Sequence, residues 1–85
     1  MRPAPDISWV VETRGLTVIS RQRGLSLSIP YPYAGLWAIL ADGTYSPGRA
    51  RGLMALLMAT DEQEAEREVE RTLAVWQAAG LLVTE

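Results

Sequence analysis

The sequence predicts an α+β fold in which a three-stranded antiparallel meander is followed by three helices. Apolar residues alternate with polar ones up to about residue 29, and from residue 33 onward they recur at helical spacing. The change of period falls at Pro30-Tyr31-Pro32, because proline cannot donate to a strand ladder and restricts the residue before it. With 85 residues, the chain is expected to form one domain over residues 1–85.

The predicted strands span residues 8–13, 16–21 and 25–29, which are rich in Val, Ile, Leu and Thr. Arg14-Gly15 and Arg23-Gly24 separate them. Each pair suits a two-residue hairpin turn, since glycine adopts the positive φ that such turns need.

These turns predict a pairing register for the meander. Val11 lies opposite Val18, and Val10 lies opposite Ile19. One face then carries the apolar side chains Trp9, Val11, Leu16, Val18, Leu25, Leu27 and Ile29. Val10 and Ile19 fall on the polar face, either as an ordinary exposed pair or as a contact for a partner.

The third strand is expected to keep one edge free. The residue pair beside a two-residue turn is hydrogen-bonded, so the main-chain groups of residues 25, 27 and 29 point at the second strand. Those of Ser26 and Ser28 then face outward. Such an edge either accepts another strand or is tolerated because it is short or covered.

Three helices are predicted at residues 33–41, 47–59 and 61–79, the second capped by Ser46-Pro47 and the third by Thr60 or Asp61. The expected inward residues are, in order, Tyr33, Leu36, Trp37 and Leu40; Ala50, Leu53, Met54 and Leu57; and Ala65, Val69, Leu73 and Trp76. Beside the last set, Arg71, Val75 and Ala78 form a flank that could line a groove.

Composition excludes most catalytic devices. The chain has 0 Cys and 0 His, which rules out thiolate nucleophiles, Cys/His zinc sites and imidazole bases. No metal-ligand spacing or nucleophile motif appears, so no cofactor is expected and a freestanding enzyme is disfavoured.

Charge is divided between the two halves, with a net +3 up to Arg51 and −5 beyond it. The six carboxylates from Asp61 to Glu70 most simply form a solvated helix face. Because DNA affinity rests on Lys and Arg, nucleic acid is not an expected partner. The N-terminus lacks the apolar segment of a signal peptide, and no uninterrupted membrane span is present, so the expected location is the cytoplasm.

Three strands followed by three helices are typical of a winged helix-turn-helix. Within that pattern, the first helix reads Gly35-Leu36-Trp37-Ala38-Ile39-Leu40-Ala41-Asp42-Gly43, and the C-terminal part contains Leu73, Trp76 and Ala79-Gly80-Leu81-Leu82. This spacing resembles the PqqD-like family (coenzyme PQQ synthesis protein D-like), the peptide-recognition elements of ribosomal peptide natural-product (RiPP) pathways. The resemblance covers about residues 8–83. It departs from the family at Pro30–Tyr33, where Asn or Thr is common, and at Arg49 and Arg51, where acidic residues are frequent.

The resemblance implies a noncatalytic peptide chaperone. Family members capture the leader segment of a precursor peptide as a strand added to the third strand's edge, and present the peptide to a modifying enzyme, often a radical SAM protein. Carried over to this chain, the peptide-binding residues are Leu25, Ser26, Leu27, Ser28 and Ile29 on the edge, with Arg71, Val75 and Ala78 on the third helix.

Two other classes of function remain open. A structural or dimerising adaptor would use Val10, Ile19 or the strand edge, which a second copy of the chain could also close. A DNA-binding winged helix would need residues 61–79 as its recognition helix, and the acidic first turns of that helix would repel phosphates.

Overall fold

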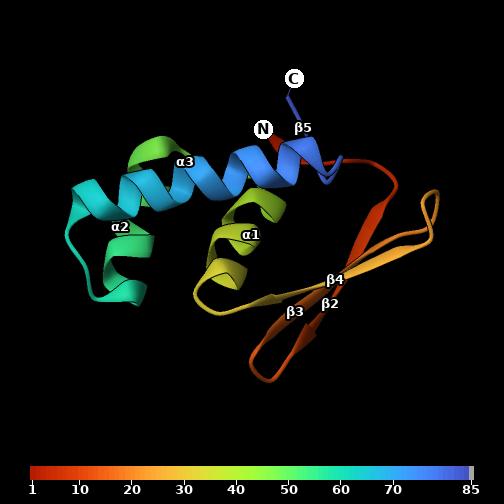
Figure 1. Cartoon of the computed structure of the whole chain (residues 1–85), viewed down its shortest axis with the longest axis horizontal. Coiled ribbons are helices and arrows are strands. Elements are labelled where there is room, and N and C mark those ends of the chain that lie inside the picture. The colour runs from red at the N-terminus through yellow and green to blue at the C-terminus, as the bar shows by residue number, and fades with distance from the viewer. Residues whose placement is uncertain (85) are drawn as a thin grey trace.

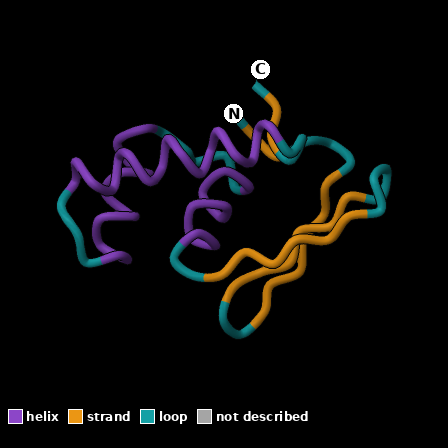
Figure 2. Tube along the Cα trace, in the orientation of Figure 1, coloured by secondary structure: helices purple, strands orange, loops and turns teal. Residues whose placement is uncertain are grey.

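In the computed structural model, which describes residues 1–84, the chain forms two small sheets and three helices. The strands are β1 (Arg2–Pro3), β2 (Ile7–Glu12), β3 (Gly15–Ser20), β4 (Leu25–Pro30) and β5 (Leu82–Val83). The helices are α1 (Tyr33–Ala41), α2 (Pro47–Met58) and α3 (Glu62–Ala78). Strands β2, β3 and β4 pair antiparallel in that order, which confirms the predicted α+β fold. The helices gather on one side of the molecule and this sheet projects from the other (Figures 1 and 2).

The predicted register of the sheet is wrong by two residues. Val11 pairs with Leu16 rather than with Val18, and Val10 pairs with Thr17 rather than with Ile19. The first turn is therefore at residues 13–14, and the second connection is a four-residue loop at residues 21–24. Because the shift is even, every side chain stays on its predicted face.

Gly15 explains the shift. It lies inside β3, opposite Pro30 of β4, rather than in the turn. A Cβ atom at this position would collide with the carbonyl oxygen of Ile29. The glycine is needed for close approach of two strands, not for the turn conformation.

The sequence prediction missed a second, two-stranded sheet that joins the ends of the chain. Arg2 pairs with Val83 and Pro3 pairs with Leu82. The Ala4 N–H also donates to the Leu81 carbonyl at 2.9 Å. Strands β1 and β5, from opposite ends of the described residues, consequently lie side by side (Figure 1).

The helix limits follow local signals. Ser46 caps α2 by accepting a hydrogen bond from the Arg49 N–H at 3.1 Å, and Asp61 caps α3 by accepting one from the Glu64 N–H at 2.8 Å. The predicted inward position of Leu57 is wrong, since its side chain is 43% exposed. No helix within residues 1–84 is long and apolar enough to cross a membrane.

The core is centred on α1, which lies between the sheet and α3. Leu36, Trp37 and Leu40 of this helix are buried completely or almost so. The Trp37 ring makes edge-to-face contacts with Trp9 of β2, at 5.8 Å between centroids, and with Trp76 of α3, at 5.4 Å. Sheet and third helix are thus held at a fixed separation by one buried indole.

Candidate functional site

The outer edge of β4 is open within the described part of the chain, because β4 is the last strand of its sheet. The Tyr31 N–H donates to the Arg14 carbonyl at 3.1 Å and continues the β3–β4 ladder beyond its last residue pair. Since hydrogen-bonded pairs alternate along an antiparallel ladder, residues 25, 27 and 29 also point their main-chain groups at β3. The N–H and C=O groups of Ser26 and Ser28 therefore point outward from the open edge, on the side of β4 opposite to β3.

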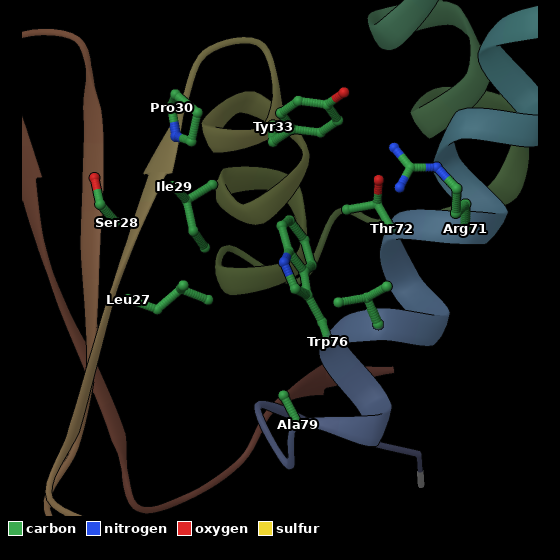
Figure 3. A pocket seen from close by; sticks show the side chains of 10 residues that line it. Leu27, Ser28, Ile29, Pro30, Tyr33, Arg71, Thr72, Trp76 and Ala79 are labelled. Atoms are coloured by element: carbon green, nitrogen blue, oxygen red, sulfur yellow. The ribbon is translucent and has the colours of Figure 1, made fainter.

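A cleft of about 260 Å³ lies between this strand and the C-terminal half of α3. Its lining residues are Leu27, Ser28, Ile29, Pro30, Tyr33, Arg71, Thr72, Val75, Trp76 and Ala79. Leu27 and Ile29 point from β4 toward Trp76 on α3, whereas the Ser28 side chain points away (Figure 3). The cleft is mostly apolar and borders the open main-chain edge, because Ser28 belongs to both.

Three polar side chains meet at the end of the cleft near Pro30. The Tyr33 hydroxyl donates to Glu68 Oε1 at 2.7 Å, and the Arg71 guanidinium donates to the same oxygen. The hydrogen bond from Arg71, followed by that from Tyr33, lowers the pKa of Glu68. Donation to this carboxylate raises the pKa of Tyr33. Glu68 is therefore ionised at neutral pH and links α1 to α3.

At the opposite end of the cleft, the loop between β3 and β4 contacts the end of α3. Arg23 of this loop donates to the carbonyl of Ala79, at the C-terminal end of α3, where cations are favoured. A smaller hollow of about 190 Å³ adjoins the cleft here, and Leu27 and Ala79 border both. The apolar surface consequently continues along the whole length of β4.

Five of the eight predicted site residues line the main cleft: Leu27, Ser28, Ile29, Arg71 and Val75. Leu25 and Ser26 border the smaller hollow instead. Ala78 is exposed and lines neither, and its neighbour Ala79 lines both.

Five residues of the cleft were not predicted as site residues from the sequence: Pro30, Tyr33, Thr72, Trp76 and Ala79. Helical projection accounts for Thr72, Trp76 and Ala79 once the side that faces β4 is known. At about 100° per residue, Ala79 lies roughly 80° from Arg71 on the side of Thr72 and Trp76, whereas Ala78 lies about 20° to the other side. No comparable signal indicated that Tyr33 would reach Glu68, because that contact joins positions 35 residues apart.

The site combines outward main-chain donors and acceptors, apolar walls and one guanidinium. Such an arrangement can bind an extended chain, with its backbone paired to β4 and alternate side chains in the cleft. Among residues 1–84, no group of His, Cys, Asp or Glu side chains is placed to hold a metal ion.

Comparison with known proteins identifies a shared fold. No protein-family model and no curated protein matches the chain. A solved structure of lasso peptide synthetase B1 complexed with the leader peptide is similar, with a TM-score of 0.80. The likeness covers 98% of this chain and 96% of the other, at 20% sequence identity. Meander and helices are therefore arranged as in that protein.

Proposed function

We propose that this protein is a noncatalytic recognition domain that captures the leader segment of a ribosomally made precursor peptide. The leader pairs as an additional strand with the outer edge of β4 and is presented to a peptide-modifying enzyme. The observation that carries the proposal is the open β4 edge beside an apolar cleft. The similar lasso peptide synthetase B1, solved as a complex with the leader peptide, supports the same assignment.

Uncovered apolar side chains around the cleft favour a protein or peptide ligand. Leu25 is 50% exposed, Leu27 is 44% exposed and Val75 is 55% exposed. They lie on both walls, on β4 and on α3. A chain seated between these walls would cover them, which is a main source of affinity in peptide recognition.

The proposal extends to family and partner. We assign the chain to the PqqD-like recognition elements and expect it to act in the cytoplasm beside an enzyme that modifies the bound peptide. A radical SAM enzyme is one candidate for that partner. Another is a peptide synthetase assembly, as suggested by the name of the similar protein.

A proline placed in the open edge tests strand addition. Ser28→Pro removes an outward N–H and leaves the β3–β4 ladder intact. Wild type and variant are immobilised as full-length chains and panned against a displayed library of random 12-residue peptides. We expect wild type to enrich extended, apolar-rich peptides and Ser28→Pro to lose their binding.

Val11→Pro is the matched control, because it removes an outward N–H from β2, on the opposite edge of the same sheet. This variant should bind the enriched peptides as wild type does. Full binding by a folded Ser28→Pro variant would exclude pairing through β4. If wild type enriches nothing and sedimentation shows a dimer that Ser28→Pro dissociates, the edge serves self-assembly instead.

A further inference from the structure

The cleft contains a single charged side chain. Arg71 is the only Asp, Glu, Lys or Arg among the residues that line it, and the other lining side chains are apolar or uncharged. The exposed Glu62, Glu64 and Glu66 are on the first turns of α3, outside the lining. Glu68, the ionised partner of Arg71, also lies outside the lining, so Arg71 is the charged side chain that a ligand in the cleft would contact directly.

Arg71 is held in place by contacts that leave most of its donors free. Its side chain is 64% exposed and hydrogen-bonds Glu68, three residues earlier, whose side chain is only 19% exposed. The same Glu68 oxygen accepts the Tyr33 hydroxyl, so the carboxylate is fixed from two elements. A guanidinium has five N–H donors in a planar fork that matches a carboxylate. Figure 3 shows this group at the Tyr33 end of the cleft.

Strand geometry relates this group to positions along a bound peptide. Cross-strand partners share a face, so peptide residues opposite Leu27 and Ile29 would point into the cleft. These two peptide residues are separated by one that points away. Ile29 lies toward Tyr33 and Arg71, whereas Leu27 lies toward Ala79 (Figure 3).

We propose that Arg71 is a specificity-determining residue that selects an acidic side chain in the bound peptide. That Asp or Glu sits opposite Ile29, two positions from an apolar residue that enters the cleft opposite Leu27. This inference rests on the proposed function and adds the chemistry of its ligand. A carboxylate can pair with the free side of the guanidinium fork in a partly desolvated cleft, where charge-assisted hydrogen bonds are strong.

Panning of the random 12-residue library tests the selectivity. Wild type is expected to enrich peptides with Asp or Glu two positions from an apolar residue. Arg71→Glu should enrich Lys or Arg at that position, and should bind the wild-type peptides about tenfold or more weakly. Arg71→Gln, which keeps a polar side chain without charge, should lose the acidic preference and retain the apolar one.

Arg67→Glu is the matched control. Arg67 also pairs with a glutamate three residues earlier, and its side chain is likewise 64% exposed, but it does not line the cleft. Its peptide profile should equal that of wild type.

The outcomes separate this inference from the proposed function. If wild type enriches apolar peptides that have no preferred acidic position, Arg71 does not select the ligand. The same holds if Arg71→Gln keeps the acidic preference of wild type. In both cases peptide capture itself still stands. Aromatic enrichment at that position would show stacking on the guanidinium and also overturn the role of Arg71. If wild type enriches no peptide, the proposed function and the role of Arg71 both lose their basis.

Discussion

At the scale of the residue, the contact between Tyr33 and Glu68 should make stability depend on pH. The pKa of Glu68 lies below its ordinary value of 4.5, so its hydrogen bonds stabilise the fold fully above about pH 4.5 and lose effect as the pH falls through the lowered pKa. Tyr33→Phe removes one of these bonds. We expect a loss of about 0.5–1 kcal/mol in unfolding free energy at neutral pH, and a smaller loss near pH 3. Denaturant titrations followed by tryptophan fluorescence measure both, and equal losses would contradict the assignment.

At the scale of the element, two glycines should respond to alanine with opposite signs. In Gly15→Ala the new methyl group meets the Ile29 carbonyl, so β3 and β4 must separate and stability should fall by about 1–3 kcal/mol. Gly52 lies within α2, and a Cβ atom at this position would meet only open space. Gly52→Ala should therefore stabilise the protein by about 0.5–1 kcal/mol through helix propensity. Thermal unfolding checks both, and a tolerated Gly15→Ala would show that the strands adjust freely.

At the scale of the whole molecule, the pairing of the chain ends should contribute to global stability. Ala4, Leu81 and Leu82 lie in or next to the β1–β5 pair and are all buried. Deleting residues 1–4 removes the partner of β5 and exposes these leucines, for which we expect a loss of about 2–3 kcal/mol. Chemical denaturation measures the loss. Hydrogen exchange should show faster exchange of the Val83 amide, which faces Arg2 in the alternation that the Ala4–Leu81 bond sets. Unchanged stability would mean that the pair is only peripheral.

Part of the site could be predicted from the sequence, and part depended on how the elements pack in the whole molecule. The face of each strand residue was predictable because side chains alternate with period two, and the two-residue register error left that alternation intact. Ser28 could accordingly be placed on the open edge despite the wrong turns. Ala78 was misplaced for Ala79 because helix spacing alone does not reveal the direction from which a neighbouring strand approaches.

Local signals in the sequence were sufficient to predict the order of the three meander strands and the three helices, the faces of the meander and the Ser46 cap of α2. Each of these depends on residues close together in the chain, through side-chain alternation, proline restriction or a cap three residues away. Tertiary structure alone decided the width of the cleft, the joining of Tyr33 to Glu68 and Arg71, and the pairing of β1 with β5. These features join residues distant in sequence, and their positions follow from how α1 packs through Trp37 between the sheet and α3.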